Sequence, residues 1–316
     1  MSSQQKLPII NFNTETLNPK TETWISTSHS VRQALEDYGC FIVSTDQIPS
    51  DMHETMFELS KDLFCLPMET KIKNSSQILG FGYGNYPSLP LYESFGIENG
   101  ATLDATRSFT DLLFPSGNDA FCKVAFEYMK LLSEIHDCVM RMVLHSYGIE
   151  DEYGRSLFYL ARFQKYRAPV NGEGPIALPS HSDKSFLGVI DDNGVKGFEI
   201  KMKNGEWIEY ESSPSTFVVV AGDPLMAWSN GRIYAPTHQV VMRTLAKDVV
   251  RYTTGLFSFM RETVTVPEKL VDDEHCLRFR PFNNIDFLKY VNTDEGKASK
   301  CAIESYCGID HHPSLQ

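Results

Sequence analysis

The sequence predicts an α+β fold with a mainly β centre: a double-stranded β-helix, or jelly roll, with an α-rich region before it and a C-terminal helix after it. Apolar residues recur at helical spacing through much of residues 1–155. Residues 156–265 change to short, strand-like runs separated by turn signals, which is the pattern of a double-sheet β fold. Residues 266–316 return to helical spacing. Because no flexible linker or internal repeat separates the three regions, we expect one cooperative unit.

In the α-rich region, apolar stripes indicate helices that end at glycine or proline. The stretch 30–39 carries Val31, Leu35 and Tyr38 at helical spacing and stops at Gly39. The predicted elements are strands over 7–12 and 40–44, helices over 30–39, 51–67 and 119–147, and a loop over 74–100 that is rich in Gly, Pro, Tyr and Ser.

Short strands dominate the central region, and the clearest is a hairpin over 198–210. Phe198 and Ile200 alternate with polar residues, and Asn204-Gly205 is a favoured two-residue turn. Further strands are predicted over 216–223, 238–242 and 249–259. The tail over 278–291 is expected to form a helix that packs over the barrel.

Composition limits the classes of function. The chain has 316 residues, 42% of them hydrophobic, so it can bury a sizeable core, and its net charge of −12 disfavours a general nucleic-acid surface. Its seven cysteines are scattered without a CxxC pair, which favours a reducing compartment. Neither a secretory signal nor an apolar run of about 18 residues is evident. We therefore predict a cytoplasmic monomer that binds a small molecule, and neither nucleic acid nor a membrane.

A candidate metal site begins in the stretch PSHSDKS, residues 179–185. Positions i and i+2 of a strand share a face, so His181 and Asp183 are expected to point into the barrel together. A carboxylate buried there needs a partner, and a metal ion is one. His238, at the start of a later strand, supplies a second imidazole. Two histidines and one carboxylate are the ligand set of non-haem Fe(II) oxygenases.

Arg251 and Thr253 are a second candidate pair, again at i and i+2, on the strand that follows His238. A guanidinium binds a carboxylate through two parallel hydrogen bonds, and a hydroxyl adds a donor. The pair therefore suits the distal carboxylate of a dicarboxylic co-substrate. Each piece is weak alone, because H-x-D is common and a strand arginine is often a surface residue. The ordered set within a β pattern is the informative signal.

At these residues the chain resembles the plant 2-oxoglutarate/Fe(II)-dependent dioxygenases, and the resemblance covers nearly its whole length. The phrases that carry it are LPIINF, ALEDYGCF, LPMETK, YESFGI, KYRAP, HSDKS, VKGFEI, AGDPLMAWSNGR and FRPF. Within that family the chain is most similar to the AOP group of glucosinolate side-chain dioxygenases and to deoxypodophyllotoxin synthase. These phrases are more specific than the metal triad alone.

The resemblance implies roles for the candidate residues. His181, Asp183 and His238 match the iron ligands, and Arg251 matches the arginine that pairs with the C5 carboxylate of 2-oxoglutarate. Thr253 stands where most relatives have serine and keeps the hydroxyl. The implied cofactors are Fe(II), 2-oxoglutarate and O2, with ascorbate as the reductant.

Three more positions follow from the same resemblance. Tyr166 matches a tyrosine at the co-substrate, and Gln164 stands where many relatives carry asparagine. Phe257 matches a position that often lines the substrate pocket, although a strand aromatic is also an ordinary core residue. Asp183 excludes halogenation, because related halogenases lack that carboxylate.

The sequence departs from the family at two places: the gap of 13 residues from His238 to Arg251, which should only lengthen a surface loop, and the segment after the triad. The stretch FLGVIDDNG after the triad replaces the usual apolar run followed by glutamine. Lys184 and Phe186 are therefore candidates for an unusual pocket, and the alternative is that they are plain strand residues. The aromatic stretch 81–92 contributes Tyr83 and Tyr92 as candidate pocket residues, with a packed surface loop as the alternative.

The implied activity is oxidation of an unactivated C–H of a small plant specialised metabolite, with release of succinate and CO2. Hydroxylation, desaturation, ring closure and dealkylation all remain open. The alternatives are an iron oxidase that does not use 2-oxoglutarate and a catalytically silent small-molecule-binding protein. A zinc hydrolase is weaker, because no positioned general base is evident.

Overall fold

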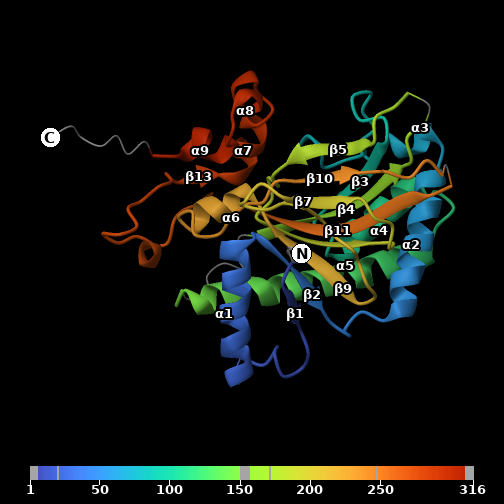
Figure 1. Cartoon of the computed structure of the whole chain (residues 1–316). Helices are drawn as coiled ribbons and strands as arrows, with labels where there is room; N and C mark the ends of the chain where they lie inside the picture. The colour runs from blue at the N-terminus through green and yellow to red at the C-terminus, as the bar shows by residue number, and fades with distance from the viewer. Residues whose placement is uncertain (1–5, 20, 150–156, 171, 247, 310–316) are drawn as a thin grey trace, which may run out of the picture.

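Two β-sheets form the centre of the computed structural model, and helices cover the outer face of the larger one (Figure 1). The structure describes residues 6–19, 21–149, 157–170, 172–246 and 248–309. In order across the larger sheet, the strands are β1 (Ile9–Asn11), β2 (Cys40–Ser44), β9 (Thr216–Ala221), β6 (Leu187–Asp192), β11 (Val250–Met260), β4 (Leu157–Arg167) and β3 (Tyr92–Glu98). The smaller sheet runs β5 (Ile176–His181), β10 (His238–Val241), β7 (Phe198–Lys201) and β8 (Trp207–Glu209).

The helices lie in three groups. Those before the barrel are α1 (Glu22–Asp37), α2 (Ser50–Cys65), α3 (Met68–Lys71), α4 (Leu103–Leu113) and α5 (Asp119–Ser146). Within the barrel segment, α6 (Asp223–Trp228) follows β9. The tail contains the 3-10 turn Glu268–Leu270 and the helices α7 (Asn284–Tyr290), α8 (Asp294–Ala298) and α9 (Ala302–Cys307), beside the small pair β12 (Thr263–Val264) and β13 (Phe282–Asn283).

One cluster of buried hydrophobic side chains joins all three regions. It extends from Ile10 in β1 to Cys307 in α9 and includes the stripe of α5 that packs on β6 and β11. Val139 and Leu132 on that stripe are fully buried. The stripe that predicted a helix therefore forms core, as 3.6-residue periodicity on a covered face requires.

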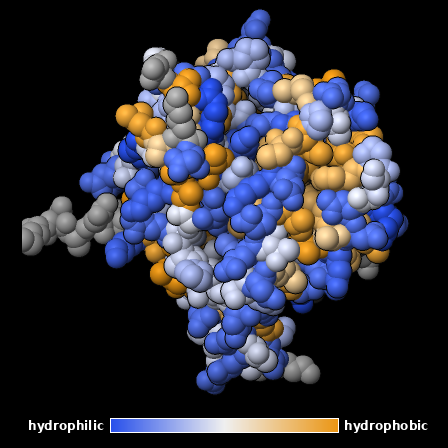
Figure 2. Space-filling model, turned by 90° about the vertical axis from the view of Figure 1, so that its right-hand side faces the viewer, coloured by the Kyte–Doolittle hydropathy of each residue, from blue (hydrophilic) through white to orange (hydrophobic). Residues whose placement is uncertain are grey.

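One face of the molecule is seen in Figure 2, where groups of hydrophobic residues lie between hydrophilic ones. Within the described part of the chain, no helix has the length and apolar character that crossing a membrane requires.

The structure confirms the predicted jelly-roll class and most of its central strands. The hairpin forms between β7 and β8, and Gly205 adopts a φ of +91° at its turn. The expectation of a loop over 74–100 is wrong for its last part, because β3 pairs with β4 at the sheet edge. Helix α4 was not predicted, and α1 begins at Glu22 rather than at residue 30.

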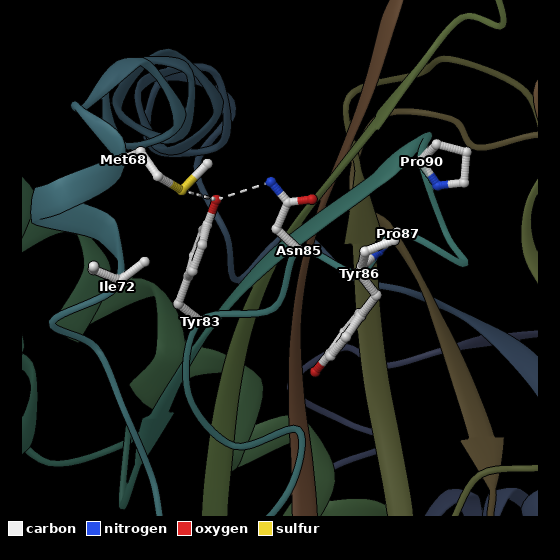
Figure 3. Close-up of a pocket in the computed structure, with 7 residues that line it drawn as sticks. All are labelled: Met68, Ile72, Tyr83, Asn85, Tyr86, Pro87 and Pro90. Carbon is white, nitrogen blue, oxygen red and sulfur yellow. Dashed lines mark hydrogen bonds between the residues drawn. The ribbon is translucent and has the colours of Figure 1, made fainter.

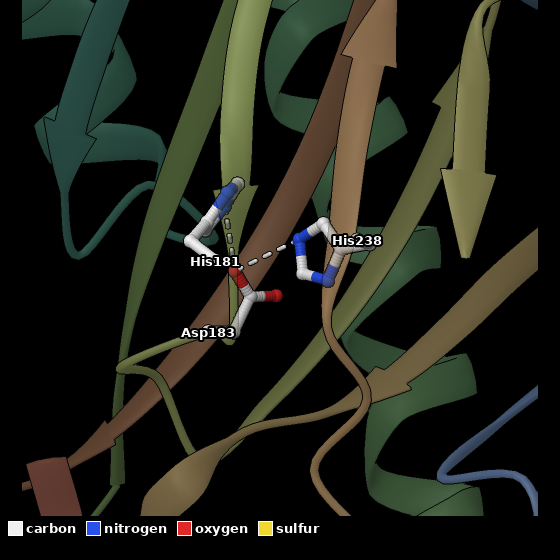
Figure 4. Close-up of side chains that lie close together, drawn as sticks. All are labelled: His181, Asp183 and His238. Carbon is white, nitrogen blue, oxygen red and sulfur yellow. Dashed lines mark ion pairs between the residues drawn. The ribbon is translucent and has the colours of Figure 1, made fainter. Parts of the chain in front are cut away.

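The local geometry at Asp183 also differs from the expectation. Strand β5 ends at His181, so Asp183 lies in the turn beyond it rather than two residues along the same strand. The turn brings the carboxylate back toward the histidine ring, and the two side chains converge without strand alternation (Figure 4).

Candidate metal centre and its two cavities

Antiparallel pairing brings the two histidines together. His238 at the start of β10 is the register partner of His181 at the end of β5, and their ring centroids lie 4.4 Å apart. Oδ1 of Asp183 lies 3.8 Å from Nε2 of His181 and 3.5 Å from Nε2 of His238 (Figure 4). One potential ligand atom from each of the three side chains falls within 4.8 Å of the others. The three predicted ligands therefore converge on one point.

Two backbone carbonyls fix which nitrogen of each ring faces that point. Nδ1 of His181 lies 2.8 Å from the carbonyl oxygen of Pro179, and Nδ1 of His238 lies 3.2 Å from that of Pro236. A carbonyl only accepts hydrogen bonds, so each Nδ1 carries the hydrogen and each Nε2 keeps its lone pair. Sequence reasoning missed these carbonyls, although the repeated pattern Pro-Ser-His and Pro-Thr-His was a usable signal.

The charges at the centre suit a cation. Desolvation, with repulsion from His238, lowers the pKa of His181 to about 4, so its ring is neutral near pH 7. Burial alone would raise the pKa of Asp183, but the two histidines and Lys184 outweigh it, and the pKa is lowered from 3.8. The centre therefore combines the neutral imidazole of His181 with the ionised carboxylate of Asp183.

One oxygen at the centre lacks a partner within the described residues. Oδ2 of Asp183 is buried and accepts no hydrogen bond there. An unpaired buried carboxylate oxygen is costly, and a metal ion would satisfy it. Two imidazole nitrogens and a carboxylate on one side of an octahedron leave three positions open, so the donor set fits Fe(II).

A small inner cavity of about 40 Å³ lies beside the triad, lined in part by Arg251, Thr253, Tyr166 and Gln164. In the β11–β4 register, Arg251 is opposite Tyr166 and Thr253 is opposite Gln164, so all four side chains share one face. The Thr253 hydroxyl donates to Oε1 of Gln164 at 3.0 Å. The structure thus brings together all four residues predicted for the co-substrate.

Two of these residues have defined hydrogen-bonding states. Burial raises the pKa of Tyr166 well above its ordinary value of 10, so its hydroxyl is neutral and available as a donor. Nη2 of Arg251 lies 2.9 Å from Oδ2 of Asp192, and Nη1 donates to the carbonyl of Val195. The Arg251–Asp192 ion pair was not predicted from the sequence.

A larger outer cavity of about 280 Å³ also borders the triad, where His181 and Asp183 are part of its lining. Phe257, Tyr92 and Lys184 line it, as predicted, and Leu288 and Val291 near α7 contribute a wall that was not predicted. A Cβ at Gly188 would lie 2.9 Å from the ring of Phe257. Glycine at this position of β6 therefore leaves room for that ring beside the metal centre.

Two cationic side chains, Lys184 and Arg162, line the outer cavity in different environments. Nζ of Lys184 lies 2.7 Å from Oδ2 of Asp223, so its charge is neutralised. Arg162 donates from Nη2 to the hydroxyls of Tyr92 at 2.9 Å and Ser94 at 3.1 Å, and its buried Nε has no partner among the described residues. No ion pair links Arg162 to a carboxylate in the described part of the chain. Arg162 was missed, although it lies two residues before Gln164 on the same face of β4.

Two predicted pocket residues lie elsewhere. Tyr83 donates to Glu93 at 2.7 Å and lines a separate cavity of about 580 Å³ with Met68, Ile72 and others (Figure 3). That cavity has no histidine or carboxylate in its lining. Phe186 is fully buried in the main core cluster. The structure therefore does not bring Tyr83 or Phe186 to the triad.

Comparison with known proteins settles the family. The family model of the 2OG-Fe(II) oxygenase superfamily matches residues 156–259. A second family model, described as "non-haem dioxygenase in morphine synthesis N-terminal", matches residues 7–108. The probable 2-oxoglutarate-dependent dioxygenase AOP1 of Arabidopsis thaliana is 36% identical over 96% of this chain and 96% of its own. The chain belongs to the 2OG-Fe(II) oxygenase superfamily. It is a 2-oxoglutarate-dependent dioxygenase, and its similarity to the AOP group confirms the resemblance seen in the sequence.

Solved structures of dioxygenases agree with the fold. The dioxygenase for auxin oxidation from rice superposes with a TM-score of 0.82 at 26% identity, covering 96% of this chain and 100% of that chain. The corresponding enzyme of Arabidopsis thaliana in complex with 2-oxoglutarate gives a TM-score of 0.77 at 25% identity, covering 86% of this chain and 100% of that chain.

Proposed function

We propose that this dioxygenase uses Fe(II), 2-oxoglutarate and O2 to oxidise an unactivated C–H of a small plant specialised metabolite, releasing succinate and CO2. The observation that carries the proposal is the convergence of His181, Asp183 and His238, with one unpartnered carboxylate oxygen, where two cavities border the same residues. The bound iron would supply the oxidising power, which no protein side chain has.

The chain's own residues would bind and orient the reactants. His181 and His238 present Nε2 lone pairs, and Asp183 presents a carboxylate, so we assign these three as iron ligands. Arg251 and Thr253 would bind the distal carboxylate of 2-oxoglutarate, with Tyr166 and Gln164 as further hydrogen-bonding groups of the inner cavity. The buried walls of that cavity would exclude water from the reacting atoms.

The outer cavity indicates the chemistry of the substrate. Phe81, Phe257 and Leu288 in its lining suit an apolar ring or chain. Arg162 adds a cation without a carboxylate partner in the described structure. Since a partly buried guanidinium is stabilised by an anion, we propose a largely apolar substrate that carries one acidic group.

The test is succinate formation by purified protein given Fe(II), ascorbate, 2-oxoglutarate and a plant metabolite extract, beside an Asp183→Ala control. Extract-dependent succinate that is absent from the control supports the function, and mass differences then identify the product. Direct measurement of iron and 2-oxoglutarate binding distinguishes this function from the two alternatives, an iron oxidase that does not use 2-oxoglutarate and a silent binding protein. An iron oxidase of another kind would turn over without 2-oxoglutarate, whereas a silent binding protein would hold both without turnover.

The compartment and the oligomeric state of the enzyme stay predictions. We propose a cytoplasmic monomer, on the grounds of its scattered cysteines and acidic charge. Gel filtration with light scattering of the purified chain tests the monomer, and imaging of a fluorescent fusion in plant cells tests the compartment.

A further inference from the structure

The arginine proposed for the co-substrate already has a carboxylate partner inside the protein. Asp192 is the register partner of Thr253, so its side chain lies on the barrel face that also carries Arg251. Oδ2 of Asp192 is 2.9 Å from Nη2 of Arg251, and both side chains are only 3% exposed. The ion pair is therefore desolvated and little screened by salt.

Asp192 is held firmly in that position. Its Oδ1 accepts hydrogen bonds from the backbone N–H of Gly194 at 2.8 Å and from the Ser212 hydroxyl at 2.7 Å. Asp192 does not line the inner cavity, whereas Arg251 does; Asp192 lines a separate cavity with His53 and Ser212. The guanidinium of Arg251 is thus paired with a fixed carboxylate of the protein and also borders the space into which an external carboxylate would enter.

We propose that Asp192 is a positioning and affinity-setting residue that weakens the hold of Arg251 on the distal carboxylate of 2-oxoglutarate. The inference rests on the proposed function of the inner cavity. Two carboxylates that share one guanidinium repel each other across a region of low dielectric, so the second binds less tightly than it would to an unpaired arginine. Asp192 also occupies one of the donors that a bidentate contact would use.

The first test measures binding without turnover. Wild-type protein and Asp192→Asn, both loaded with Mn(II), are titrated by calorimetry with 2-oxoglutarate and with 2-oxobutyrate, which lacks the distal carboxylate. The amide keeps an acceptor for Arg251 but removes the charge. We expect Asp192→Asn to bind 2-oxoglutarate about tenfold more tightly or better, and 2-oxobutyrate within about twofold of wild type.

Glu199→Gln is the matched control. Glu199 is also buried and paired with an arginine, Arg243, but neither residue lines the two cavities beside the triad. We expect its affinity for 2-oxoglutarate to equal that of wild type. A gain in Glu199→Gln as large as in Asp192→Asn would overturn the proposal, because the effect would then be one of net charge.

The remaining outcomes separate this inference from the function on which it rests. If both proteins bind 2-oxoglutarate equally, or Asp192→Asn binds it less tightly, the role of Asp192 is wrong and the dioxygenase function stands. If neither binds 2-oxoglutarate, both proposals fail. Binding by Asp192→Asn alone supports both.

A second measurement needs no variant, which matters if Asp192→Asn does not fold. Wild-type protein is titrated with 2-oxoglutarate and with its C5 methyl ester, which keeps the 2-oxo acid and has no distal charge. If Asp192 already neutralises Arg251, the protein should bind 2-oxoglutarate less than about tenfold more tightly than its C5 methyl ester. An unpaired arginine would give a difference of about a hundredfold or more. A difference of about a hundredfold or more therefore contradicts the role of Asp192.

Discussion

At the scale of single residues, the proposed substrate contact at Arg162 gives a direct prediction. Arg162→Gln should lose about tenfold or more of extract-dependent succinate formation, because a neutral amide replaces the cation that holds the acidic group. Binding of 2-oxoglutarate should stay unchanged. In the wild type, the active compound should be retained on an anion-exchange column.

Arg261→Gln is the control for that experiment, since Arg261 is exposed, stacks on Phe158 and lines neither of the two cavities. It should keep full activity. If the wild-type protein forms succinate only with the neutral fractions of the extract, the substrate is not acidic and the proposal is contradicted. Loss of 2-oxoglutarate binding in Arg162→Gln would instead assign Arg162 to the co-substrate.

A second residue-scale prediction concerns pH and stability. Nε2 of His53 lies 3.3 Å from Oδ2 of Asp191, and this hydrogen bond raises the pKa of His53 above 6.5. Desolvation raises the pKa of Asp191 above 3.8, so the folded protein binds more protons than the unfolded chain at both groups. Stability should therefore fall as pH rises.

The histidine part of this effect is isolated by His53→Gln. Its contribution is fully present below pH 6.5 and is lost as pH rises through the folded-state pKa of His53. We expect the difference in unfolding free energy between wild type and variant, measured by urea denaturation, to shrink over that range. A difference that is constant or grows with pH would show that the His53–Asp191 bond does not titrate as described.

At the scale of elements, two glycines that end helices differ in their surroundings. Gly39 follows α1 with a φ of +70°, and a Cβ there would lie 2.3 Å from the carbonyl oxygen of Tyr234. Gly148 follows α5 with a φ of +66°, and a Cβ there would meet nothing within 4 Å. Both positions strain any other residue, but only the first also lacks space.

Substitution by alanine should separate these two costs. Gly148→Ala should destabilise the protein by about 1 kcal/mol, the cost of a left-handed alanine. Gly39→Ala should cost about 1–3 kcal/mol more, because the backbone of Tyr234 must move. Urea denaturation of both variants measures the difference, and equal losses would mean that the contact at Tyr234 relaxes freely.

The elements show where sequence patterns suffice. The stripe of α5 and the hairpin of β7 and β8 are local signals, and both were predicted correctly. The predicted two-residue turn Asn204-Gly205 is wrong in detail, because Gly205 N–H donates to the carbonyl of Met202 and the loop has three residues, 203–205. Strand β3 was missed because prolines and glycines dominate the stretch before it, and because most of its residues are buried, which removes the alternation of a half-exposed strand.

The residues of the candidate site also differ in whether a local sequence pattern could predict them. His181, Asp183, His238, Arg251 and Thr253 were predicted because their side-chain chemistry and order are themselves a pattern. The pairing of Asp192 with Arg251 and the burial of Phe186 depend on which strands lie side by side. No spacing within one segment contains that information.

At the scale of the whole molecule, the shared core predicts one cooperative unit. The main cluster includes Ile10 from the first region, Leu256 from the barrel and Phe287 from the tail. Calorimetry should therefore give a single unfolding transition, with equal calorimetric and van't Hoff enthalpies. Two separate transitions would show that residues 1–155 or 266–316 fold independently of the barrel.

The placement of the cavity walls bears on how such enzymes diversify over generations. The proposed ligands lie on β5, β10 and the turn after β5, whereas Leu79, Phe81, Leu288 and Val291 reach the outer cavity from segments far away in the chain. After a gene duplication, changes in those distant segments would alter which compound is accepted while the iron chemistry is inherited intact. Enzymes that share this arrangement would thus be able to change substrate while their iron ligands stay the same.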